Sequence, residues 1–185
     1  MIGITSLWLP IVLSAVIVFV ASSVIHMFLS WHSSDFKKLP EEDKVMAALR
    51  PFGIPLGEYV MPQACNNAER REQAFKDKVN AGPVAFLNVM PSDYGMARSL
   101  VLWFLYCIGM GIFAAYIAGH ALAPGAHYLE VFRFAGAAAF GGYALALMQN
   151  SIWYRRAWSS TFKSMADGLV YAMLTAGTFG WLWPA

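Results

Sequence analysis

Charged residues are scarce in this sequence: Asp, Glu, Lys and Arg make up 13% of its 185 residues, roughly half the share of a typical soluble domain. Hydrophobic residues make up 58%, and long stretches of the chain carry no charge at all. A soluble core could not enclose so many uninterrupted apolar segments, so we expect the chain to lie in a lipid bilayer. The formal net charge of +2 is too small to indicate nucleic-acid binding.

Cysteines and chemical motifs are also few. Cys65 lies in a charged region and Cys107 in the middle of an apolar segment, so we expect two free thiols. The sequence contains no HExxH pattern, no nucleophile elbow, no Gly-rich phosphate loop and no paired-cysteine metal spacing. We therefore predict no catalytic residue, metal or cofactor, and this absence favours a non-enzymatic role over an enzymatic one.

Four apolar segments are long enough to cross a bilayer, which takes about 20 helical residues. They cover residues 7–29, 99–119, 131–149 and 165–183. The sequence therefore predicts an all-α membrane fold, a four-helix transmembrane bundle with a small α/β insertion between the first two helices. We expect residues 1–31 to hold the first helix, 32–94 the insertion and 95–185 the other three helices.

Lys and Arg predict the orientation of these spans. Nine of the thirteen lie between spans one and two and three between spans three and four, which leaves only Arg133 near the other side. Because positive residues favour the cytoplasmic side of a membrane, we expect residues 32–94 and 151–163 in the cytoplasm. Both termini then lie on the outer side, which for a bacterial inner membrane is the periplasm.

The insertion has its own turn and helix signals. Leu39-Pro40 and three acids predict a helix that ends near Arg50, and residues 57–61 predict a short strand. Asn66 or Asn67 is expected to cap a second helix, with Glu69 three residues beyond Asn66, that runs to about residue 80. The apolar run at 84–89 predicts either a buried strand or a segment lying on the membrane.

Small residues recur every four positions in the last three spans. Such stripes allow helix backbones to approach closely in lipid, where no hydrophobic force drives helices together. They predict packing inside the bundle or against another membrane protein. The candidate packing residues are Gly111, Ala115, Gly142, Gly168 and Ala172.

Polar side chains gather near the expected cytoplasmic ends of the spans. This candidate polar layer comprises His26, Arg98, Gln149, Asn150 and Asp167. Ionisable groups at membrane depth are costly, so one interpretation is a proton or ion site with Asp167 and His26 as titrating groups. The other is a structural cluster in which Asp167 pairs with Arg98 or with an arginine of the last loop, and it is the simpler of the two.

The remaining histidines do not predict a haem or metal site. His26 and His32 are expected on one helix, about 120° apart around its axis, which is the wrong geometry for two axial haem ligands. His120 and His127 lie at the opposite end of the spans, in a loop that offers only these two metal ligands.

Three stretches carry a resemblance to a known group. WHSSDFKKLPEEDKV, YALALMQNSIWYRRAWSS and DGLVYAMLTAGTFGWLWP resemble segments of uncharacterised small bacterial four-span integral membrane proteins. The resemblance implies a bacterial source and four spans, and it implies no site residues or activity.

Two functional hypotheses follow. The first is a non-enzymatic accessory, assembly or interaction subunit of a bacterial cytoplasmic-membrane complex, with the bilayer and other membrane subunits or further copies of itself as partners. The alternative is a small oligomeric transporter or ion- or proton-conducting protein that uses the polar layer. A water-filled cavity reaching Asp167 would favour transport, whereas a dry bundle with an exposed apolar groove would favour a subunit role.

Overall fold

The computed structural model describes residues 1–93 and 95–185 and divides them into two compact units. The first unit is Met1–Lys37 with Met96–Ala185, and the second is Lys38–Gly95. The predicted end of the insertion falls on Tyr94, which lies outside the described residues.

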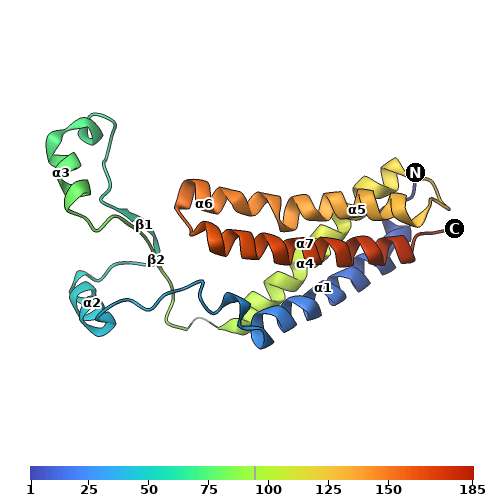
Figure 1. Cartoon of the computed structure of the whole chain (residues 1–185), viewed down its shortest axis with the longest axis horizontal. Coiled ribbons are helices and arrows are strands. Elements are labelled where there is room, and N and C mark those ends of the chain that lie inside the picture. The colour runs from blue at the N-terminus through green and yellow to red at the C-terminus, as the bar shows by residue number, and fades with distance from the viewer. Residues whose placement is uncertain (94) are drawn as a thin grey trace. The chain divides into compact units, whose positions relative to one another are not determined.

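The first unit is a bundle of four long helices (Figure 1). They are α1 (Trp8–Phe28), α4 (Met96–Ala121), α5 (Tyr128–Tyr143) and α7 (Trp158–Trp181). Helix α1 packs against α4 and α7, and α5 packs against the same two helices. The two termini lie at one end of the bundle, where Ile2 N–H donates to the Gly119 carbonyl and Gly125 N–H donates to the Pro184 carbonyl.

Three of these segments are long and apolar enough to cross a membrane: Ile4–Phe28, Met96–Ala121 and Tyr128–Tyr154. The first includes the 3₁₀ turn η1 (Ile4–Leu7). They correspond to the first three predicted spans. Helix α7 coincides with the fourth and is of similar length, but Lys163, Asp167 and its glycines and threonines make it less apolar.

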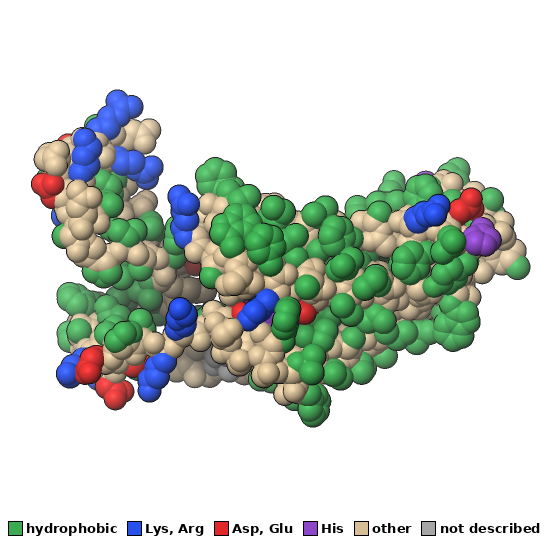
Figure 2. Space-filling view, in the orientation of Figure 1, with side chains coloured by type: hydrophobic (Ala, Val, Ile, Leu, Met, Phe, Trp, Pro, Cys, Tyr) green, Lys and Arg blue, Asp and Glu red, His purple; other side chains and the backbone are tan. Residues whose placement is uncertain are grey.

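The interior of the bundle is built from small and hydroxyl-bearing residues. The fully buried alanines and hydroxyl residues include Ala114, Ala118, Ala135, Ala139, Ser14, Thr161 and Thr175. A few large apolar residues, among them Leu7, Val18 and Phe179, are also fully buried, but many lie outside, as in the α1 series Val12, Val16, Val20 and Val24, each at least 40% exposed. Figure 2 shows hydrophobic side chains covering the length of the bundle, with charges gathered toward its ends. This inside-out distribution matches a bilayer as solvent, since lipid tails solvate valine as well as a protein core does.

The predicted third helix is not continuous. Helix α5 ends at Tyr143, the backbone of Ala144 leaves helical geometry, and the 3₁₀ turn η5 (Leu145–Leu147) leads into α6 (Met148–Tyr154). The Tyr106 hydroxyl donates to the Gly142 carbonyl at 3.0 Å. A freed carbonyl at membrane depth needs such a donor, which explains how the break is tolerated.

The candidate packing residues contact neighbouring helices within the chain. A Cβ added at Gly111 would lie 3.1 Å from the Ile11 carbonyl oxygen, and one at Gly168 would lie 2.5 Å from that of Tyr143. At Gly142 the added atom would meet the flexible end of Met110. Ala115 and Ala172 are buried.

The second unit contains short elements and one two-stranded sheet. Its elements are α2 (Glu42–Leu49), the 3₁₀ turns η3 (Arg50–Phe52) and η4 (Glu69–Arg71), α3 (Gln73–Ala81), and strands β1 (Gly57–Met61) and β2 (Ala85–Val89). The strands are antiparallel, with Gly57 opposite Val89 and Met61 opposite Ala85. The predicted strand at 57–61 is confirmed. The run at 84–89 is also a strand, but it is not buried, since its residues alternate between half-buried and exposed.

The predicted second helix of this unit begins later than expected. Asn66 Oδ1 accepts from Glu69 N–H at 2.9 Å, and the Glu69 carboxylate accepts from Cys65 N–H at 2.7 Å. This reciprocal pair stabilises the turn η4, but the chain becomes extended at Glu72 before α3 starts. The prediction that Asn66 or Asn67 caps the second helix is therefore wrong: Asn66 caps the 3₁₀ turn η4, and α3 begins after Glu72 without a side-chain cap.

Candidate functional site

The chain turns back toward the bundle directly after α1, and this turn places a second histidine beside the first. Helix α1 ends at Phe28, and the 3₁₀ turn η2 (Ser30–His32) carries His32. The expectation that His26 and His32 share one helix is therefore wrong. Their rings are 4.6 Å apart between centroids and tilted by 33°.

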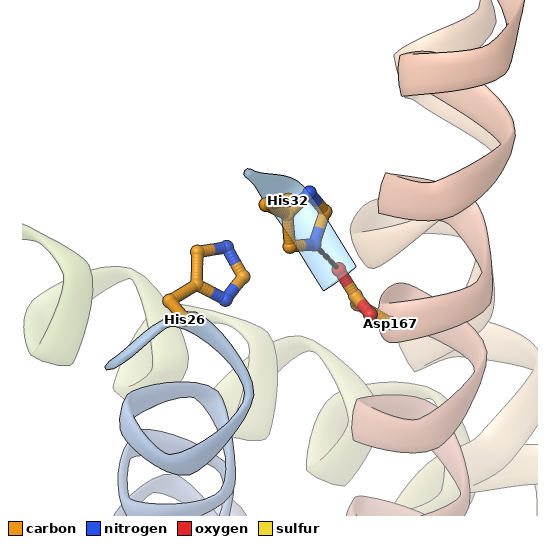
Figure 3. A group of neighbouring side chains, drawn as sticks. All are labelled: His26, His32 and Asp167. Carbon is orange, nitrogen blue, oxygen red and sulfur yellow. Dashed lines mark hydrogen bonds and ion pairs between the residues drawn. The ribbon is translucent and has the colours of Figure 1, made fainter. Parts of the chain in front are cut away.

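His32 bridges two carboxylates. Its Nδ1 lies 2.7 Å from Asp35 Oδ2, and its Nε2 lies 2.6 Å from Asp167 Oδ2 on the third turn of α7 (Figure 3). A carboxylate oxygen accepts hydrogen bonds, so both contacts are hydrogen bonds when the imidazole carries a proton on each nitrogen. His32 is then an imidazolium held between two anions.

The charges around His32 are partly removed from water. Burial by itself lowers the pKa of His32, but the hydrogen bonds to Asp35 and Asp167 outweigh burial and raise this pKa above its ordinary value. The hydrogen bond from His32, assisted by Lys163, lowers the pKa of Asp35 below its ordinary value. Both shifts favour the charged forms of the pair.

Lys163 ties this turn to the start of α7. Its ammonium donates to the Trp31 carbonyl at 2.8 Å, to Ser34 Oγ at 2.8 Å and to Asp35 Oδ1 at 3.2 Å. It also lies 5.7 Å from the centre of the Trp31 ring. These contacts hold Asp35, and through it the orientation of the His32 ring.

A partly open cavity of about 780 Å³ in the bundle reaches His26 and Asp167. It lies among α1, α4, α5 and α7, and its lining includes His26, Asp167 and Tyr171. Serine hydroxyls and the rings of Trp103 and Tyr106 line it as well. The wall is therefore mostly apolar, with a small set of polar groups.

One polar atom at the cavity wall is unsatisfied. Tyr171 is 4% exposed, and across residues 1–93 and 95–185 its hydroxyl is buried and has no hydrogen-bond partner. It lies one helical turn beyond Asp167 on α7. Buried polar groups normally have a partner, so this hydroxyl marks a place where a ligand or water can bind.

The structure brings together only part of the predicted polar layer. His26 and Asp167 are neighbours, as the ion-site interpretation requires. Among the described residues, no hydrogen bond or ion pair joins Arg98, Gln149 or Asn150 to Asp167. The expected pairing of Asp167 with an arginine is therefore wrong, because His32 takes that place.

Sequence reasoning missed His32, Asp35, Lys163 and Tyr171 as members of this site. The spacing of His32 and Asp35, three residues apart just after an apolar helix, was a readable local signal. The hydrogen bond between His32 and Asp167 of α7 could not be predicted from the sequence, because 135 residues separate the two.

The arrangement can hold a proton, a cation or a metal ion. It combines two imidazoles, one buried carboxylate and access from a cavity, with a second carboxylate behind His32. No protein-family model, no curated protein sequence and no solved structure matches this chain.

Proposed function

We propose that this protein is a small multi-pass membrane transporter of a cation, which binds at Asp167 and His26 in the cavity of the bundle. The observation that carries the proposal is the cavity itself, which reaches a buried carboxylate and an unpartnered tyrosine hydroxyl. Ionisable groups at this depth are expensive and are found where ions or protons pass. In this proposal α7 is a fourth span and residues 38–95 face the cytoplasm.

The broken third helix supports the same proposal. Gly142, Tyr143 and Leu147, which flank the break, all line the cavity. Interrupted helices in membrane transporters border the binding site, because irregular backbone is tolerated at that depth only where protein or a cavity surrounds it. The break thus points to the same place as the polar cluster.

The subunit role expected from the sequence now has less support. That hypothesis rested on the compact size of the chain, the absence of a chemical motif and small-residue stripes that could face another protein. Gly111, Gly168 and Gly180 instead face Ile11, Tyr143 and Tyr128 of the same chain, so these positions are already used.

Transport is tested with the full chain in proteoliposomes that contain an ion-sensitive dye. We expect uptake of at least one small cation, with a loss of tenfold or more in Asp167→Asn. Tyr171→Phe removes a hydroxyl that makes no protein hydrogen bond, so it should lower uptake without lowering the melting temperature.

The control is Glu130→Gln, since Glu130 is exposed and lies at the start of α5, at the opposite end of the bundle. It should transport like the original chain. If no cation is taken up and the protein co-purifies from its membrane with a stoichiometric partner, the subunit role replaces transport.

The membrane topology is tested separately, by labelling of cysteine residues. Cys65 is exposed in the second unit whereas Cys107 is buried in α4, so a membrane-impermeant thiol reagent should label only Cys65. We expect labelling in inverted membrane vesicles but not in intact spheroplasts, with Cys65→Ser as the blank. In that Cys65→Ser background, Ala185→Cys should be labelled in spheroplasts, and failure there would contradict a fourth span.

A further inference from the structure

The two histidines and the buried aspartate offer three metal-ligand atoms within 4.8 Å of one another. We propose that His26, His32 and Asp167 bind one divalent first-row transition-metal ion, of which Zn²⁺ is the representative. This inference deepens the proposed function by naming the class of cation at the same site, and it rests on that function for its physiological meaning. The sequence had predicted no metal site, because it contains no metal-binding spacing.

The donor atoms are close to the spacing that a metal requires. Around a tetrahedral ion with bonds of about 2.0–2.1 Å, neighbouring donors are roughly 3.3 Å apart. His32 Nε2 and Asp167 Oδ2 are 2.6 Å apart and would have to separate slightly. His26 is exposed at the end of α1, so its ring is free to rotate inward to complete the set.

The surroundings of His32 are those of a metal ligand. Metal-binding histidines almost always donate their second ring N–H to a carboxylate or carbonyl, which fixes the tautomer. Here Nδ1 lies 2.7 Å from Asp35 Oδ2, and Asp35 is itself held by Lys163. That arrangement directs Nε2 toward Asp167 Oδ2, where a proton fits at the observed 2.6 Å and a metal ion would replace that proton once the two atoms separate.

A purely structural ion pair explains only two of the three residues. The contact between His32 and Asp167 needs no further group. Within the described part of the chain His26 makes no hydrogen bond, yet its ring lies beside that of His32 and lines the cavity. A role as the third ligand of a metal ion explains why His26 lies there.

The donor set selects the class of ion. Two imidazole nitrogens and one carboxylate suit Zn²⁺ and its first-row neighbours, whereas Ca²⁺ and Mg²⁺ prefer oxygen ligands and Cu⁺ prefers sulfur. Three protein ligands leave a coordination position open, as in sites that exchange ligands rather than in structural zinc sites. Because His26 and Asp167 also line the cavity, the ion has a path to and from the site.

The test is a binding titration with the full chain, purified in mild detergent without a histidine tag. We expect one Zn²⁺ per chain, competed by Co²⁺ but not by Mg²⁺ or Ca²⁺. Bound Co²⁺ should give the intense visible bands of a four- or five-coordinate site. His26→Gln, His32→Gln and Asp167→Asn should each weaken binding by at least about tenfold, and Asp35→Asn by about 10–100-fold through loss of orientation.

The matched control is His120→Gln, which removes an imidazole at the other end of the bundle and should leave the affinity unchanged. Because His26 is exposed, His26→Gln should also keep the melting temperature of the metal-free protein. The proposal is overturned if the folded protein binds neither Zn²⁺ nor Co²⁺ at micromolar concentration, or if His26→Gln binds as tightly as the original chain.

Failure of this inference and failure of the transport function give different results. Zn²⁺ binding without Zn²⁺ uptake into proteoliposomes retains the metal site and removes transport. Uptake of another cation without Zn²⁺ binding retains transport and removes the metal site.

Discussion

The two units of this protein obtain their order in different ways. The bundle buries many small and hydroxyl-bearing side chains with a few large apolar ones, and leaves many large apolar side chains outside. In the second unit, residues 38–93 and 95 include only one buried residue, Ala64. A transmembrane helix satisfies its backbone within itself and needs close packing rather than a hydrophobic core. The described residues of the second unit form almost no buried core, so its order rests on local turns, caps and one short sheet.

Close packing in the bundle should fail most severely at Gly168. Gly168→Ala places a methyl group 2.5 Å from the Tyr143 carbonyl oxygen, a backbone atom that cannot rotate away. We expect a loss of about 1–3 kcal/mol in the free energy of unfolding, measured by denaturation in detergent. Gly141→Ala is the matched control, because an added Cβ there meets nothing within 4 Å. Equal stabilities would contradict the packing account.

The cost of removing a lysine should differ between the units. Lys163→Met removes three donated hydrogen bonds from a side chain that is 21% exposed, so we expect a loss of about 1–3 kcal/mol. Lys38→Met removes an ion pair to Glu42 at 3.6 Å, in which the lysine is 80% exposed. Exposed pairs contribute about 0–1 kcal/mol, so its stability should barely change. Thermal melts of both variants, recorded side by side, check the contrast.

The smallest effect is expected from the turn η4. Asn66→Ala removes the acceptor for Glu69 N–H, and a lost cap costs about 1 kcal/mol. We expect faster amide hydrogen exchange around residues 68–72, with no change in the helices of the bundle. Asn67→Ala, one residue along, is the control. Faster exchange in the bundle as well would show that the two units are energetically coupled.

Much of the local structure could be predicted from neighbouring residues. Residues 57–61 form a strand, Glu69 N–H donates to Asn66 Oδ1 and Cys65 N–H donates to the Glu69 carboxylate, because these depend on contacts within a few positions. The break after Tyr143 could not be predicted, since Ala144, Leu145 and Ala146 are compatible with a helix. The close approach of α7 at Gly168 to the Tyr143 carbonyl accompanies the break and depends on the packed bundle.

The sequence by itself determined that this chain has long apolar helices, where the short elements of its second unit lie, and that His26 and Asp167 lie toward the same end of the bundle. Periodicity, capping and hydropathy act over one or two turns, so they can be read directly. Only the tertiary structure decided that His32 joins these two residues, that Asp35 and Lys163 hold it there, and that a cavity opens onto the group. The contacts of His32 and Asp35 with α7 join residues more than 120 positions apart, and their geometry follows from how helices pack, which no local pattern encodes.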